Sequence, residues 1–126
     1  MDMPIEAPTQ SDWHAATHAE LMRRARASSA PEAAWLHLEA AHVVGQQRLW
    51  PHTVTHAHML RLALRQRDPL EAAGQLLRLA LVPLGHLSGR LPLGNPGRAT
   101  VSAFAPLPVR PELQALIQQA RQAGTG

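Results

Sequence analysis

The sequence predicts an all-α protein built from helical hairpins. Two stretches, Ser29-Ala-Pro-Glu32 and Asp68-Pro-Leu-Glu71, carry a pattern that starts helices: a capping side chain, an early proline and a glutamate three residues on. In the segments that follow them, apolar residues recur every three or four positions, as on one face of a helix. The 126 residues, 45% of them hydrophobic, suit one domain with one core. We therefore expect a single helical domain over residues 11–122, preceded by a flexible tail of residues 1–10.

Five helices are expected, at about 12–28, 30–45, 51–67, 69–82 and 112–122. Ser11 is the expected cap of the first helix, and Ser29 that of the second. Gly45 ends the second helix and Pro51 opens the third. The fourth helix is expected to end before Pro83, because a proline ring clashes with the preceding helical turn.

A faint internal repeat relates the first two helices to the next two. Residues 31–34 read Pro-Glu-Ala-Ala and residues 70–73 read Leu-Glu-Ala-Ala, and on the same offset Leu21 matches Leu60. The repeat predicts two similar hairpins stacked on each other, as a tetratricopeptide-like array or a four-helix bundle. The next stretch, residues 83–110, is crowded with glycine and proline, so we expect an extended segment that wraps across the helices before the short last helix.

The composition excludes several classes of protein. Cysteine is absent, which excludes disulfides, thiolate metal sites and cysteine nucleophiles. The net charge is only +3, and the four aromatic residues do not alternate with arginines, so nucleic-acid binding is not expected. No apolar run is long enough to span a membrane, and the N-terminus has no secretory signal pattern. A soluble, cytoplasmic protein is expected.

A cluster of histidines and one carboxylate marks the second and third expected helices. Residues three or four apart share a helix face, so Glu39 and His42 project together, and so do His52 and His56. If the chain folds back near Gln47, His42 lies level with His52, and Glu39 lies close to His56. Four side chains that commonly bind metals would then converge in one layer between the two helices.

Imidazole and carboxylate groups in this number suit zinc or non-haem iron, including the arrangement of two histidines and one carboxylate. We therefore predict a site for zinc or iron(II), with copper(II) also compatible, whose ligands are Glu39, His42, His52 and His56. Two other interpretations stay open. The four residues could form an ordinary polar seam in a helical scaffold that binds a peptide or protein partner in a groove. Alternatively, Glu39 and a histidine could serve as base and acid in an enzyme without metal.

Five motifs, in order along the chain, resemble the signature of a small bacterial family, domain of unknown function 3703. They are Leu38-Glu39-Ala-Ala-His42-Val-Val-Gly45-Gln46, His52-x-x-x-His56-x-x-Met59-Leu60, Gly74-Gln75-Leu76-Leu77-Arg78, Pro92-x-Gly94-Asn95-x-Gly97 and Val101-Ser102-x-Phe104. The resemblance runs from about Glu20 to Ile117. It implies an all-helical protein of similar length in a family without an assigned activity.

The resemblance also implies that six polar residues belong to the family pattern: Glu39, His42, His52, His56, Gln75 and Asn95. Gln75 is then a candidate to support a metal-bound histidine through its amide. Asn95 is a candidate for ligand binding. Where the family usually reads Gly-Asn-Thr-Gly-Gly, this chain reads Gly94-Asn-Pro-Gly-Arg98, so this member would hold a ligand at that loop differently.

Overall fold

The computed structural model describes residues 12–125, with the backbone alone for the last two. The predicted tail and the predicted cap Ser11 lie outside this range. The described residues form five helices and no strand: α1 (Ala15–Ala27), α2 (Pro31–Gly45), α3 (Leu49–Arg65), α4 (Pro69–Ser88) and α5 (Pro111–Thr125). The prediction of an all-α fold is confirmed.

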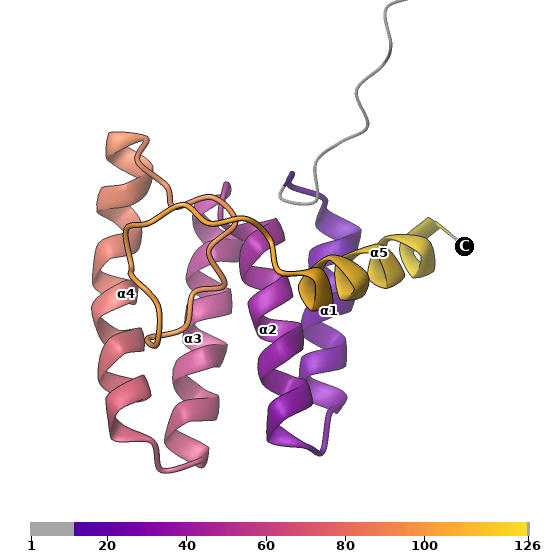
Figure 1. Cartoon of the computed structure of the whole chain (residues 1–126), viewed down its shortest axis with the longest axis horizontal. Helices are drawn as coiled ribbons and strands as arrows, with labels where there is room; N and C mark the ends of the chain where they lie inside the picture. The colour runs from indigo at the N-terminus through magenta and orange to yellow at the C-terminus, as the bar shows by residue number, and fades with distance from the viewer. Residues whose placement is uncertain (1–11, 126) are drawn as a thin grey trace, which may run out of the picture.

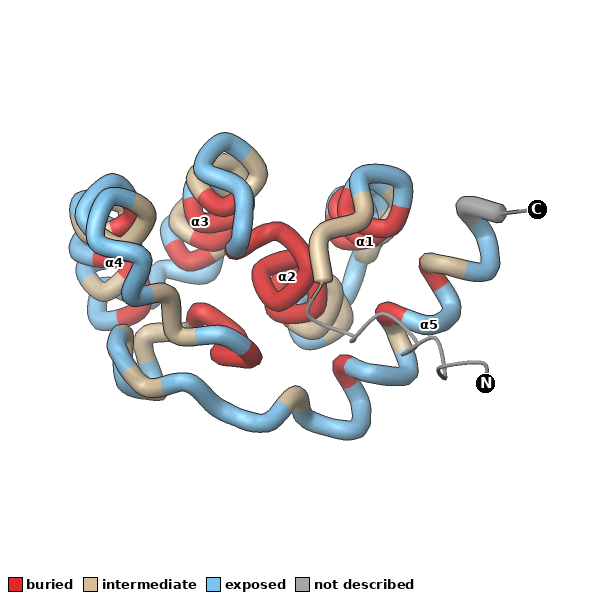
Figure 2. The backbone as a smooth tube through the Cα atoms, turned by 90° about the horizontal axis from the view of Figure 1, so that it is seen from above, coloured by how far each residue is buried: buried red, intermediate tan, exposed pale blue. Residues whose placement is uncertain are grey.

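The first four helices stand side by side in one row and run alternately up and down (Figure 1). Each packs on its neighbour in the chain, with α2 and α3 in the middle of the row (Figure 2). Residues 89–110 leave the end of α4 and cross one side of the row, and α5 then packs against α1 and α2. The repeat relation between the two hairpins stays a prediction.

The starts of the helices agree with the expected chemistry only in part. α1 begins at Ala15 with His14 as its cap, so the predicted cap Ser11 is wrong, and α3 begins at Leu49, two residues before the predicted start at Pro51.

The carboxylate of Asp68 accepts a hydrogen bond from the backbone N–H of Glu71 at 3.1 Å, so Asp68 caps α4 as predicted. At α2 the predicted cap, Ser29, is wrong. The capping residue is Ala30, which has no side-chain hydrogen bond to offer, and the first turn relies on the fixed φ of Pro31.

The predicted end of α4 before Pro83 is also wrong, because the helix continues to Ser88 and ends at Gly89 in the left-handed conformation, with φ of 72°. Pro83 removes one backbone hydrogen bond, but the residue is exposed to solvent. The extra turns carry His86 to within hydrogen-bonding distance of His52. This contact helps to hold the end of α4 against α3.

Replacing Pro83 by alanine is expected to stabilise the protein by about 1–3 kcal/mol, because alanine restores the missing backbone donor inside the helix. Urea unfolding of the two proteins measures the difference. Replacing the exposed Ala80, one turn earlier, by serine serves as the control for a change on the same helix. A destabilised Pro83→Ala variant would contradict the continuous helix.

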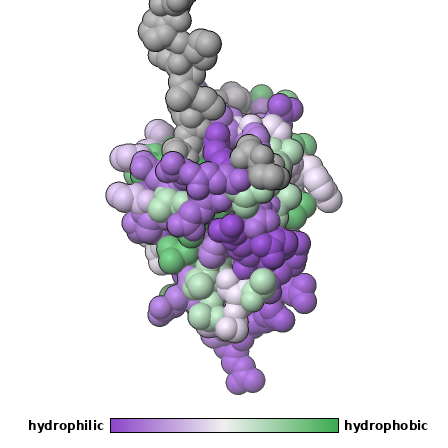
Figure 3. Space-filling view, turned by 90° about the vertical axis from the view of Figure 1, so that its right-hand side faces the viewer, coloured by the Kyte–Doolittle hydropathy of each residue, from purple (hydrophilic) through white to green (hydrophobic). Residues whose placement is uncertain are grey.

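The hydrophobic core lies between α1, α2, α3 and α5. Its fully buried apolar side chains include Leu21, Val43, Val44, Met59, Leu113 and Ile117. The second half of α2 and the residue that follows it, 38–46, are buried at every position, so the polar side chains there face the interior as well. The end of the molecule formed by α1 and α5, by contrast, presents mainly hydrophilic residues (Figure 3). Within the described residues, no helix is both long enough and apolar enough to cross a membrane.

Candidate metal centre

Three buried imidazoles converge between α2 and α3. The Nε2 atom of His42, on α2, lies 3.2 Å from Nε2 of His52 and 3.1 Å from Nε2 of His56, which are one turn apart on α3. All three side chains are at most 5% exposed. The structure therefore brings together the three histidines that the helical spacing predicted to meet.

The other ring nitrogen of two of these histidines points to a group that can only accept a hydrogen bond. Nδ1 of His42 lies 2.6 Å from the backbone oxygen of Asn95, and Nδ1 of His56 lies 2.7 Å from Oε1 of Gln75. The amide orientation of Gln75 is fixed because its nitrogen donates to Glu71 and to the carbonyl of Gly97. Both histidines must therefore carry their proton on Nδ1, which leaves a lone pair on each Nε2.

These lone pairs face each other across 3.1 Å in a buried site. Such an arrangement is repulsive unless a cation lies between the nitrogens. A proton does not serve at neutral pH, because burial lowers the pKa of His42 well below its usual value, that of His52 to about 3 and that of His56 to about 4. The site thus presents neutral imidazoles, the form in which histidine binds metal ions.

The spacing of the three nitrogens matches a metal ion of ordinary size. In a tetrahedral zinc site with zinc–nitrogen distances of about 2.0–2.1 Å, neighbouring ligand nitrogens lie about 3.3 Å apart. The distances from His42 to its two partners are 3.2 and 3.1 Å, and all three donor atoms lie within 4.8 Å of one another. The cluster can therefore hold one metal ion with little rearrangement.

The third histidine of the cluster, His52, contacts a residue for which the sequence predicted no role, His86. Nδ1 of His52 lies 3.0 Å from Nε2 of His86, in the last turn of α4. No role was expected for His86, because α4 was expected to end before it. A signal was present in the spacing, since Gln75, Arg78, Val82 and His86 form one stripe on a helix that runs past the proline.

The structure places Glu39 away from the histidines. One oxygen of its carboxylate lies 2.9 Å from Arg110 and the other 3.6 Å from Arg98. Glu39 is also absent from the group of described side chains whose ligand atoms lie within 4.8 Å of one another, which is made of the three histidines. The prediction of Glu39 as a fourth ligand is therefore corrected to a role in an ion-pair network.

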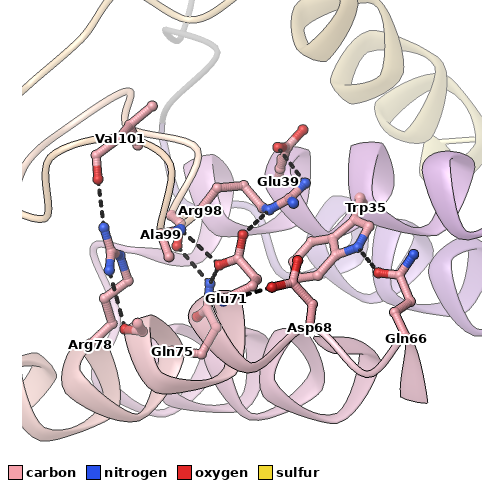
Figure 4. Close-up of polar contacts among 12 residues, drawn as sticks. Trp35, Glu39, Gln66, Asp68, Glu71, Gln75, Arg78, Arg98, Ala99 and Val101 are labelled. Atoms are coloured by element: carbon pink, nitrogen blue, oxygen red, sulfur yellow. Dashed lines mark hydrogen bonds and ion pairs between the residues drawn. The ribbon is translucent and has the colours of Figure 1, made fainter. Parts of the chain in front are cut away.

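A second buried carboxylate supports the centre indirectly (Figure 4). Glu71 accepts hydrogen bonds from Arg98 at 2.6 Å, from the backbone N–H of Ala99 at 2.7 Å and from Gln75 at 3.0 Å. Burial alone would raise the pKa of Glu71, but these hydrogen bonds outweigh it and the pKa is lowered. An ionised carboxylate thus orients the Gln75 amide, whose oxygen accepts a hydrogen bond from Nδ1–H of His56.

The loop that carries Asn95 is shaped by the side chain of that residue. Its amide nitrogen donates to the carbonyls of Ser102 and Ala105, and its oxygen accepts from the backbone N–H of Gly97. Asn95 therefore holds the loop together, and it contacts the centre only through its backbone carbonyl, on His42. Gly97 lies so close that a Cβ atom there would be 2.7 Å from the His42 ring, and its φ is 87°.

The remaining histidines on α2 and α3 lie outside the cluster. His37 and His58 each hydrogen-bond a carbonyl of their own helix, those of Ala33 and Val54. His18, on α1, is buried and hydrogen-bonds the hydroxyl of Thr55. None of these three joins the group of facing nitrogens among the described residues.

One family model matches this chain, over residues 10–117, which include every residue of the centre. The chain belongs to the family described as "Protein of unknown function (DUF3703)". The resemblance seen in the sequence is thereby confirmed. No curated protein and no solved structure matches the chain, so any assignment of function to this DUF3703 protein depends on its own geometry.

In this DUF3703 protein a cavity of about 650 Å³ reaches the three histidine rings. His42, His52 and His56 form part of its wall. Apolar side chains from α4 and from residues 89–110 make up most of the rest: Leu81, Val82, Leu84, Leu91, Pro92 and Phe104. The centre is therefore enclosed by protein on most sides and faces a cavity on one.

Acidification is expected to destabilise the metal-free protein below about pH 6.5. Burial lowers the pKa of His52 from 6.5 to about 3 and that of His56 to about 4, so below pH 6.5 the unfolded chain binds protons that the folded chain does not. The contribution of these neutral rings to the free energy of unfolding is fully present above pH 6.5 and is lost as the pH decreases. Urea unfolding should show a loss of at least about 2 kcal/mol between pH 6.5 and 5, above the range of carboxylates. Constant stability there would contradict neutral buried imidazoles.

Proposed function

We propose that this protein binds one divalent transition-metal ion, with zinc the best fit, through Nε2 of His42, His52 and His56. The observation that carries the proposal is the contact between Nε2 of His42 and Nε2 of His56, two nitrogens that each carry a lone pair and lie 3.1 Å apart. Both rings are committed to donate from Nδ1, so neither can donate a hydrogen bond to the other. A metal ion between them converts a repulsive contact into two bonds.

The set of ligands favours zinc over iron(II). Three imidazoles without a carboxylate are a familiar ligand set for zinc, whereas iron(II) in oxygenases is bound by two histidines and one carboxylate. The nearest candidate in the sequence, Glu39, pairs with Arg98 and Arg110 instead. The affinity of nitrogen ligands for divalent ions rises from iron to copper along the first transition row and falls again at zinc, so copper(II) binds most tightly.

Hydrogen bonds on the far side of two of the three rings support the proposal. Metal-bound histidines usually donate their other N–H to a carbonyl or a carboxylate, which orients the ring and strengthens it as a ligand. Here the partners are the Asn95 carbonyl for His42 and the Gln75 amide, backed by Glu71, for His56. This arrangement is the one expected around a bound metal, and it is costly to build for an ordinary polar seam.

The centre we propose keeps one coordination position open. Three protein ligands leave the fourth position of a tetrahedral zinc ion for water or a small ligand. The cavity of about 650 Å³ is lined by the same three rings, and it gives that position room. Zinc bound in this way acts as a Lewis acid and lowers the pKa of a bound water molecule. The proposed function is therefore that of an open zinc centre rather than a closed structural one.

Zinc titration of the full-length protein, purified without a histidine tag and treated with a chelator, tests the proposal. We expect one zinc ion per chain, a rise in the thermal midpoint that grows with zinc concentration, and no release of protons from the histidines at neutral pH, where they are already neutral. Magnesium at the same concentrations should have no effect, because it prefers oxygen ligands. Absence of zinc binding, or an equal response to magnesium, would overturn the proposal.

Replacing Glu39 by glutamine is expected to leave one zinc ion per chain bound with affinity within about threefold of the wild type, because its carboxylate is paired with Arg98 and Arg110 and not with the metal. The free energy of unfolding should fall by only about 1 kcal/mol, since Arg98 keeps its ion pair with Glu71 and Arg110 keeps its ion pair with Glu112. Equilibrium dialysis measures the zinc. A variant that folds but no longer binds zinc would restore Glu39 as a ligand.

A further inference from the structure

The cavity at the centre combines an apolar wall with a polar floor. The wall comes from two elements, α4 with Leu81, Val82 and Leu84, and the crossing segment with Leu91 and Phe104. Its volume, about 650 Å³, lies within the range of cavities that bind small organic molecules. The histidines form the floor, so a molecule that fills the cavity would lie along hydrocarbon and end at the proposed metal.

The charged side chains that line this cavity, Arg78 and Arg90, are both basic, and the nearby carboxylate of Glu71 does not line it. Arg78 lines it and is only 8% exposed, and its two terminal nitrogens donate to the backbone carbonyls of Gly74 and Val101. No carboxylate in the described part of the chain forms an ion pair with Arg78, and no acidic residue lines the cavity. A divalent ion on the three histidines would add to this positive charge. The floor therefore favours an anion.

The rim of the cavity is apolar as well. Leu84, Leu87 and Phe104 line it and are 61%, 86% and 73% exposed, respectively. Covering large exposed apolar side chains with hydrocarbon removes their surface from water, which favours binding. A small inorganic anion would reach the floor but would leave these side chains in contact with water.

We propose that the cavity binds a monocarboxylate with an apolar body, such as a medium-chain alkyl or an aryl carboxylate. The carboxylate occupies the open position of the metal, beside the guanidinium of Arg78. The hydrocarbon lies between α4 and the crossing segment and covers the apolar rim. This inference rests on the proposed function, because the metal supplies half of the recognition of the head group.

Calorimetric titration of the zinc-loaded, full-length protein with octanoate tests the proposal, with the zinc content of the same samples measured first. Each methylene group buried adds about fourfold to affinity, so octanoate should bind at least about tenfold more tightly than butyrate. Octanol and octylamine have the same chain without the negative charge, and they should bind at least about tenfold more weakly than octanoate. Equal affinity for all four compounds would overturn the proposal.

Variants of Arg78 separate its charge from its structural contacts. Arg78→Lys keeps the charge and should bind octanoate within about threefold of the wild type, whereas Arg78→Met should lose at least about tenfold for octanoate and nothing for octanol. If Arg78→Met does not fold, Ala103→Trp, which fills the cavity, should abolish octanoate binding, with the exposed Ala80→Trp as its control. Octanoate binding unchanged in Ala103→Trp would place the ligand elsewhere and overturn the proposal.

Cobalt(II) in place of zinc reports on the head group directly, because its visible absorption changes with its ligands. We expect octanoate to shift the cobalt bands, and octanol to leave them unchanged. Octanoate that binds without a shift would overturn the contact with the metal. If the protein binds one zinc ion per chain but does not bind octanoate, this inference alone is overturned. If the protein binds no zinc, the proposed function is overturned as well.

Discussion

Replacing His42 by alanine is expected to abolish zinc binding at micromolar concentrations. Its Nε2 atom lies 3.2 and 3.1 Å from the other two ligand nitrogens, so loss of this ring removes a ligand that lies close to both of the others. Loss of a hydrogen-bond partner of a metal-bound histidine already costs about 10–100-fold in affinity, and loss of the ligand itself should cost more than about 100-fold. Competition with a coloured chelator measures affinities over this range.

The matched control is His58→Ala. His58 lies on α3 near the cluster, but its ring hydrogen-bonds the carbonyl of Val54 within its own helix. We expect this variant to bind zinc as the wild type does. Zinc binding retained by His42→Ala, or lost equally in the two variants, would contradict the assignment of the ligands.

Replacing Gly97 by alanine is expected to destabilise the protein by about 2–4 kcal/mol and to weaken zinc binding at the same time. The φ of Gly97 is 87°, a conformation that costs a residue with a side chain about 1–3 kcal/mol. A Cβ atom would also lie 2.7 Å from the ring of His42, so either the loop or the ring must move. Urea unfolding of the metal-free protein and a zinc titration measure the two effects separately.

Gly89→Ala separates backbone strain from the contact with the histidine. Gly89 has a similar φ of 72°, but nothing lies within 4 Å of a Cβ atom built there. This variant should lose about 1 kcal/mol of stability from strain alone and bind zinc normally. Equal losses in the two variants, or unchanged zinc affinity in Gly97→Ala, would contradict the close packing of the loop on His42.

The histidine cluster was predictable because it depends on local geometry. His52 and His56 share a face at a spacing of four residues, and the short connection between α2 and α3 sets which turn of α2 lies beside them. Glu39 was expected beside His56 on the same grounds, but its carboxylate pairs with arginines instead. Its partners, Arg98 and Arg110, come from the crossing segment and its end. The path of that segment has no periodicity from which contacts could be derived.

The role of His86 was missed for a different reason. A proline inside a helix costs about 3 kcal/mol, and on that ground α4 was expected to end before Pro83. Tertiary contacts outweigh this cost, since the later turns pack His86 on His52 and Gly85 against Leu91. Local preferences predicted which helices form, but the end of α4 was decided by what lies beside it.

X-ray absorption spectroscopy of the zinc-loaded protein is the most direct test of a centre made of three imidazoles. The account predicts four nitrogen or oxygen neighbours at about 2.0 Å, with the multiple scattering of three imidazole rings. One light neighbour should be replaceable, as expected for an open position. A spectrum with fewer than two imidazoles, or with the signature of six oxygen neighbours, would contradict it.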